Sequence, residues 1–136
     1  MFLLDTNIVS ELRKTRPHGA VVAWISNIAD SDIFISAATV GEIQAGVERT
    51  RDHNPLKASE LERWLVEVVL GMQVIAADAK TFRIWAALMH RRQGHLSADA
   101  MIAATAVQHG LTVATRNIAD FKQFAAPLFN PFEATA

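Results

Sequence analysis

The chain has 136 residues, of which 51% are hydrophobic and 20% are charged, and its formal net charge is -1. This length suits one compact domain with enough apolar side chains for a core, so we expect a single domain over residues 1–136. A nearly neutral chain lacks the overall positive field that drives general binding to nucleic acid. The absence of cysteine excludes a disulfide scaffold and a thiolate zinc site.

The sequence shows no signal for export or membrane insertion. It begins with an apolar run that lacks a basic leader region, and no apolar stretch reaches the roughly 18 residues of a membrane helix. We therefore expect a cytoplasmic protein without membrane association. Local basic clusters would have to provide any contact with nucleic acid, although each cluster alone is better explained by charges that complement helix ends. These clusters are Arg13, Lys14 and Arg16; Arg49 and Arg51; Arg91 and Arg92; and Arg116 with Lys122.

Short apolar runs of strand length alternate with segments of helical periodicity. The expected strands are residues 2–4, 33–35, 74–75, 112–114 and 128–129. The expected helices are residues 6–13, 19–28, 38–50, 56–70, 78–92 and 97–109, with a short helical turn after Asn117. This alternation predicts an α/β fold in which helices cover both faces of a central parallel sheet of about five short strands.

Residues typical of helix ends mark several of these boundaries. Gly71 should stop the helix at 56–70, and Gly110 should stop the helix at 97–109. Ser97 is the expected N-cap of that last helix. Arg92 and Gly94 suit the C-terminus of the helix at 78–92.

Four carboxylates, Asp5, Glu42, Asp99 and Asp120, border or interrupt apolar stretches near the starts of expected helices. Open parallel sheets form their sites at the carboxyl ends of the strands, so these acids could meet at one rim. Asp99 is the only charge in the apolar segment 97–107, which predicts that it is buried. Buried carboxylates that repel one another are usually stabilised by a divalent cation with oxygen ligands, such as Mg²⁺ or Mn²⁺.

Each acid also has a local structural explanation. Asp5 could N-cap the first helix, and Thr39 with Glu42 matches a capping box. Asp99 would complement a helix dipole, and Asp120 could cap a turn. The functional interpretation depends on their combination, because one or two hard cations at such a site would acidify a bound water and stabilise charge on a phosphodiester.

Three polar residues beside the acids, Thr6, Asn7 and Asn117, could hold waters or phosphate oxygens around that site. Bonding within turns and caps explains them equally well.

Four blocks of sequence, each with one of the acids, and a closing segment together resemble a known family, the PIN-domain ribonucleases. The resemblance is to the VapC-type toxins of bacterial toxin–antitoxin pairs, including the FitB-like branch. It runs through FLLDTNIVSEL (2–12), TVGEIQAG (39–46), SADAMIAATA (97–106), TRNIADF (115–121) and the closing FNPF (129–132).

The resemblance implies an Mg²⁺- or Mn²⁺-dependent endoribonuclease with a Rossmann-like sheet that forms a homodimer. It also implies inhibition by a cognate antitoxin of the VapB or FitA kind, which binds operator DNA and covers the acidic groove of the toxin. By this carry-over, Asp5 and Asp99 are direct metal ligands, and Glu42 is a ligand or orients water. Some members carry an acid where this chain has Asn117, and others use the acid three residues later, here Asp120. Asn117 supplies no charge, so Asp120, the fourth acid of the expected set, or a metal-bound water would have to compensate.

Two alternatives remain open from the sequence. A catalytically inactive member could act as a binding module that represses its own operon together with an antitoxin. A phosphatase with Asp5 as its nucleophile is weaker, because that chemistry usually wants a second acid two residues later and position 7 is Asn.

Overall fold

The computed structural model describes residues 1–133 and contains one parallel sheet with the strand order β3-β2-β1-β4-β5. The strands are β1 (Phe2–Leu4), β2 (Ile33–Ser36), β3 (Gln73–Ile75), β4 (Thr112–Ala114) and β5 (Leu128–Phe129). All four neighbouring pairs are parallel, with β1 in the centre. The predicted α/β fold with five short parallel strands is confirmed.

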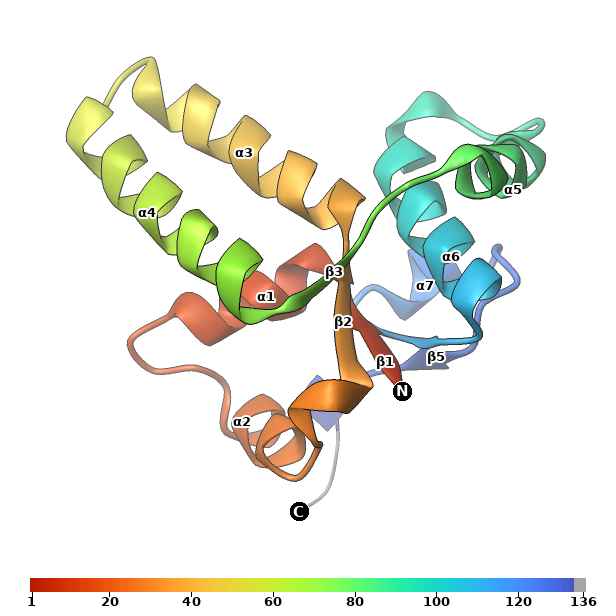
Figure 1. Cartoon of the computed structure of the whole chain (residues 1–136), viewed down its shortest axis with the longest axis horizontal. Coiled ribbons are helices and arrows are strands. Elements are labelled where there is room, and N and C mark those ends of the chain that lie inside the picture. The colour runs from red at the N-terminus through yellow and green to blue at the C-terminus, as the bar shows by residue number, and fades with distance from the viewer. Residues whose placement is uncertain (134–136) are drawn as a thin grey trace.

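Seven α-helices connect or follow these strands in the described residues (Figure 1). They are α1 (Thr6–Arg13), α2 (Gly19–Ser26), α3 (Ala37–Arg51), α4 (Pro55–Gly71), α5 (Ala79–Met89), α6 (Ser97–His109) and α7 (Ile118–Phe121). Three short 3₁₀ turns complete the order: η1 (Asp30–Asp32), η2 (Gly94–Leu96) and η3 (Pro131–Glu133). Each predicted helix is present, and most boundaries agree within two residues.

The predicted end of α5 is wrong. The helix stops at Met89, and Arg91 adopts a left-handed conformation with φ 65°. The chain is tied here by Arg92, which donates from its guanidinium to the carbonyls of Leu88 at 2.6 Å and Gln123 at 2.8 Å. Gly94, the expected stop signal, instead begins η2. A long-range contact therefore sets this boundary.

The central strand divides the interior into two cores. Leu3 packs in one core with α6 and α7, and Leu4 packs in the other with α1, α2 and α4. Successive strand residues point to opposite faces, so a strand covered on both sides must be apolar at every position, as β1 is. Figure 1 shows α1, α2 and α4 on one side of the sheet and α5 and α6 on the other.

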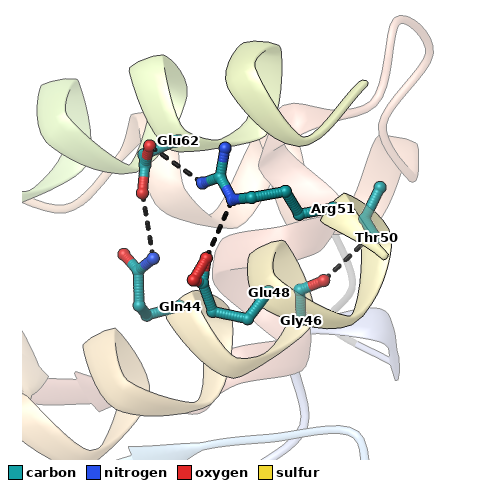
Figure 2. Close-up of polar contacts among 6 residues, drawn as sticks. All are labelled: Gln44, Gly46, Glu48, Thr50, Arg51 and Glu62. Carbon is teal, nitrogen blue, oxygen red and sulfur yellow. Dashed lines mark hydrogen bonds and ion pairs between the residues drawn. The ribbon is translucent and has the colours of Figure 1, made fainter. Parts of the chain in front are cut away.

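Helices α3 and α4 form a long antiparallel pair whose polar contacts fix the orientation of α3 (Figure 2). Glu62 on α4 accepts hydrogen bonds from Gln44 and Arg51 on α3, both at 3.0 Å. Arg51 also pairs with Glu48 at 3.0 Å. These exposed ion pairs add little stability, but they hold α3, which carries Glu42, against its neighbour.

The two glycines expected to stop helices behave differently. Gly110 is the C-cap of α6 with φ 66°, a left-handed conformation that favours glycine. Gly71 is the last residue of α4, and the cap position after it is the extended Met72. Within residues 1–133, no helix is both long and apolar enough to cross a membrane.

Replacing Gly110 by Ala should lower the free energy of unfolding by about 1 kcal/mol, because a Cβ strains the left-handed conformation. Gly71→Ala is the matched control: it ends a helix without positive φ, with no atom within 4 Å of an added Cβ. It should be neutral or slightly stabilising. Urea unfolding of both variants measures the difference, and equal stabilities would refute the role of Gly110.

Candidate active site

The carboxyl ends of β1 and β4 define the candidate site. The two strands are parallel neighbours with Leu4 opposite Ala114. From β1 the chain proceeds to β2 and β3 on one side and later returns to β4 on the other side. Such a reversal in strand order opens a crevice at the carboxyl ends of the strands. Asp5 begins this crevice, and its backbone N–H donates to the Ala114 carbonyl at 2.9 Å.

Asp5 is buried, with 4% of its surface exposed, and both of its carboxylate oxygens accept hydrogen bonds. Oδ1 accepts from the Thr6 backbone N–H at 2.7 Å, and Oδ2 accepts from the Thr115 hydroxyl at 2.8 Å. Burial raises the pKa of Asp5, the Thr115 and Thr6 bonds oppose that rise, and the nearby charges of Glu42 and Asp120 add to it. The predicted N-cap role is confirmed, since Asp5 occupies that position of α1.

Glu42 is not part of a capping box, so that local explanation is wrong. The N-cap of α3 is Ser36, whose hydroxyl accepts from the Ala38 backbone N–H at 3.0 Å. Thr39 lies inside the first turn and is fully buried. Glu42 Oε1 instead accepts a 2.6 Å hydrogen bond from the Thr6 hydroxyl, which links α3 to the start of α1 beside Asp5.

Asp99 is half-buried in the first turn of α6. The expected N-cap role of Ser97 is wrong: Ser97 is the first residue of α6, and Leu96 at the preceding position makes no capping bond. Burial raises the pKa of Asp99 to about 6, with further contributions from the charges of Asp5, Glu42 and Asp120. Unlike Asp5, Asp99 has no side-chain hydrogen-bond partner among residues 1–133, so nothing local offsets its desolvation.

Asp120 lies in the first turn of α7 and is exposed. Its charge contributes to the raised pKa of both Asp5 and Asp99, which places it within electrostatic range of the other acids. Asn117 occupies the N-cap position of α7 without a side-chain capping bond. Its backbone N–H donates to Thr115 Oγ1 at 2.9 Å, so Thr115 connects the start of α7 to Asp5.

The charges of the four acids therefore act on a common region, but residues 1–133 do not contain a preformed metal site. No group of three or more His, Asp or Glu side chains in residues 1–133 is arranged to hold a metal ion. The residues present still fit a hard cation. All the donors are oxygens, and a positive charge would offset the burial and the mutual repulsion that raise the pKa of Asp5 and Asp99. Asn7 Oδ1 is also a buried acceptor without a partner.

A cavity of about 440 Å³ is lined by Glu42, whereas Asp5, Asp99 and Asp120 are not among its lining residues. It contains Thr6, Asn7, Glu42 and Asn117, which the sequence analysis singled out, together with residues that it did not place there. Its lining is Thr6, Asn7, Ser10, Glu11, Lys14, Glu42, Arg116, Asn117 and Phe132. A cavity of about 480 Å³ near the starts of β2 and β3 is larger but has only Asp30 as a titratable group. A third cavity, of about 620 Å³, lies along α4 and contains Glu62, Arg63 and Glu67 but none of the four predicted acids. The first cavity is the candidate site because it contains Glu42.

The basic clusters separate into different roles. Of the clustered basic residues, Lys14 and Arg116 line the cavity, whereas Arg51 and Arg92 make structural contacts elsewhere. Phe132 is the main contributor that the sequence analysis missed as a site residue. It lies in the FNPF segment, whose match to the family's closing block was the available signal.

Comparison with known proteins places this architecture in one class. A PIN domain family model matches residues 2–127, and the chain belongs to the PIN-domain family. Toxin FitB of Neisseria gonorrhoeae is 35% identical over 139 residues, covering 97% of this chain and 99% of FitB. VapC ribonuclease Y4jK of Sinorhizobium fredii is 37% identical over 144 residues, covering 98% and 99%. The resemblance to VapC-type toxins of the FitB-like branch is confirmed.

Solved structures agree with the sequence comparison. The structure titled FitAcB from Neisseria gonorrhoeae matches with a TM-score of 0.83 at 35% identity, covering 98% of this chain and 100% of that chain. The structure titled FitAB bound to an IR36 DNA fragment matches with a TM-score of 0.81 at 32% identity, covering 100% and 99%.

Replacing Asp99 by Asn should stabilise the metal-free protein at pH 7.5 by about 1–2 kcal/mol, after allowance for solvent screening. The pKa of Asp99 is raised from 3.8 to about 6. The contribution of this shift to the free energy of unfolding is therefore complete below pH 4 and is lost as the pH rises through 6. The advantage of Asp99→Asn should therefore appear between pH 4 and 7. Urea unfolding in EDTA across this range measures it.

The matched control is Glu60→Gln on the exposed side of α4, which should follow the wild type at every pH. If Asp99→Asn is less stable than the wild type at pH 7.5, the carboxylate stabilises the fold and the electrostatic argument is wrong.

Proposed function

We propose that this chain is a divalent-metal-dependent endoribonuclease that hydrolyses RNA phosphodiester bonds as the toxin of a toxin–antitoxin pair. The observation that carries the proposal is the link through Thr6 between Asp5 and Glu42, at the carboxyl end of β1, with Asp99 and Asp120 within electrostatic range of Asp5. Membership of the PIN family and similarity to a protein named as a VapC ribonuclease support the reaction class.

The four carboxylates would hold Mg²⁺, with Mn²⁺ as a substitute. When bound, the cation supplies Lewis acidity, which acidifies water and offsets negative charge on the phosphate. Asp5 and Asp99 are the proposed direct ligands, and Asp120 is the proposed fourth acid. Asp120 acts electrostatically on both of them, whereas Asn117 carries no charge.

The protein prepares these side chains to different degrees. Thr115 and the Thr6 backbone fix the orientation of Asp5. Thr6 also occupies Glu42 Oε1, which leaves Oε2 to bind the cation or to orient the attacking water. Side chains held by such bonds lose less entropy when they bind a ligand. Thr6 is therefore a proposed positioning residue for two of the acids.

The electrostatic cost of the site favours catalysis over the binding-module alternative. An inactive module would need a surface for its partner but no buried acids. In this chain, burial and mutual repulsion raise the pKa of Asp5 and Asp99. Proteins retain such destabilising groups mainly where function requires them.

We further propose that a cognate antitoxin of the FitA or VapB kind covers the acidic site and carries the complex to operator DNA. The support comes from relatives whose structures are titled as complexes, FitAcB and FitAB bound to an IR36 DNA fragment. A homodimer and a cytoplasmic location belong to the same proposal.

Antitoxin-free protein should cleave a panel of single-stranded and structured RNAs in Mg²⁺ or Mn²⁺ but not in EDTA. Asp99→Asn should reduce cleavage at least about 100-fold, because it removes one negative ligand from the site. Gel analysis of end-labelled RNA measures both effects. Glu60→Gln should cleave like the wild type. An intact panel after treatment with folded, metal-supplied wild type would end the nuclease proposal.

Thr115→Val should weaken Mn²⁺ binding about 10- to 100-fold, because it removes the hydroxyl that donates to Asp5 Oδ2 while keeping the shape of the side chain. Isothermal titration with Mn²⁺ measures the affinity independently of RNA cleavage. Thr105→Val is the control: Thr105 is equally buried but bonds to Met101 and Ser36 instead of the acids. Equal Mn²⁺ affinities for both variants would contradict a positioning role for Thr115.

A further inference from the structure

The cavity lined by Glu42 contains an arginine stacked on an aromatic ring. The guanidinium carbon of Arg116 lies 4.3 Å from the centroid of the Phe132 ring. Arg116 follows β4 by two residues and is exposed, whereas Phe132 is half-buried in η3. Phe132 also packs against His18, with 5.1 Å between ring centroids. The ring is thereby held from a second side, and the contact places the Arg116 side chain at the cavity.

Two other arginines in the described part of the chain lie near aromatic rings, but neither lines this cavity. The guanidinium carbon of Arg13 lies 5.7 Å from the centroid of the Trp64 ring. Arg92 lies 5.4 Å from the Phe124 ring, but its guanidinium also bonds to Leu88 and Gln123. Its role is structural. Within residues 1–133, Arg116 makes neither an ion pair nor a side-chain hydrogen bond, so its donors remain available to a ligand.

The rest of the cavity lining is mostly polar or charged. Asn7 belongs to this lining, and its Oδ1 atom is buried without a hydrogen-bond partner in residues 1–133. Lys14 adds positive charge while its ammonium group pairs with Glu11 at 2.9 Å. The cavity thus combines the Arg116–Phe132 stack with a lysine and with Glu42, one of the four proposed acids.

We propose that Arg116, supported by Phe132, is the platform on which one unpaired base of the RNA substrate stacks. Proteins recognise single-stranded RNA largely by stacking bases on aromatic rings or guanidinium planes. This inference rests on the proposed function and deepens it: the cavity selects single-stranded over double-stranded RNA, because a paired base cannot leave its helix to reach Arg116 without cost.

The test measures binding separately from cleavage, in the Asp99→Asn background with Mg²⁺ present. The probe is a fluorescein-labelled 12-nucleotide RNA, used single-stranded and annealed to its complement, with affinity read by anisotropy. Arg116→Lys should weaken single-strand binding about tenfold and leave duplex binding unchanged, because lysine keeps the charge but loses the plane. The salt dependence of binding should stay the same, whereas Lys14→Ala should reduce its slope by about one.

Arg83→Lys on the exposed side of α5 is the matched control and should bind both probes normally. In the active protein, Arg116→Lys should raise KM about tenfold and change kcat less than twofold. Single-strand binding by Arg116→Lys equal to that of its parent overturns the platform, whatever the cleavage assay shows. If single-strand binding requires Arg116 but the wild type does not cleave RNA, the stacking role of Arg116 is supported and the proposed nuclease activity is contradicted. A parent protein that binds neither probe overturns both.

Discussion

The parallel pairing of β1 with β2 on one side and β4 on the other is the constraint on which the rest of the structure depends. Parallel strands end at a common edge, so the residues that follow them share one rim. Asp5 follows β1, Thr115 follows β4, and the helix carrying Glu42 follows β2. The register places Leu4 beside Ile35 on β2 and Ala114 on β4, which brings the ends of the three strands together.

The chain compensates the resulting concentration of negative charge unevenly. Asp5 accepts two hydrogen bonds and Glu42 accepts one, whereas Asp99 has no such partner in the described residues. If Asp99 had only a structural role, we would expect its carboxylate to accept hydrogen bonds, because buried polar groups in protein interiors normally have a hydrogen-bond partner. The uncompensated carboxylate is instead typical of a site whose stability is completed by a ligand.

The basic side chains are also divided between different places in the fold. The net charge of -1 gives no general attraction for nucleic acid, and two of the basic side chains, Arg51 and Arg92, are used in contacts within the fold. Arg51 joins α3 to α4, and Arg92 ties the end of α5 to Gln123. Lys14 and Arg116 line the candidate cavity together with Glu11 and Glu42, so the formal charges of its lining cancel.

The sequence by itself determined the elements and their order, because the apolar periodicity of a helix or strand is a local property. Residues 97–109 form a helix that ends at Gly110 as predicted, since glycine adopts that φ of 66° without the strain that a Cβ adds. Tertiary structure decided the roles that depend on distant segments. It replaced the expected capping bond of Glu42 with one from Thr6, and it placed Arg116 over Phe132. Such contacts join residues with no shared periodicity, so only the packed sheet brings them together.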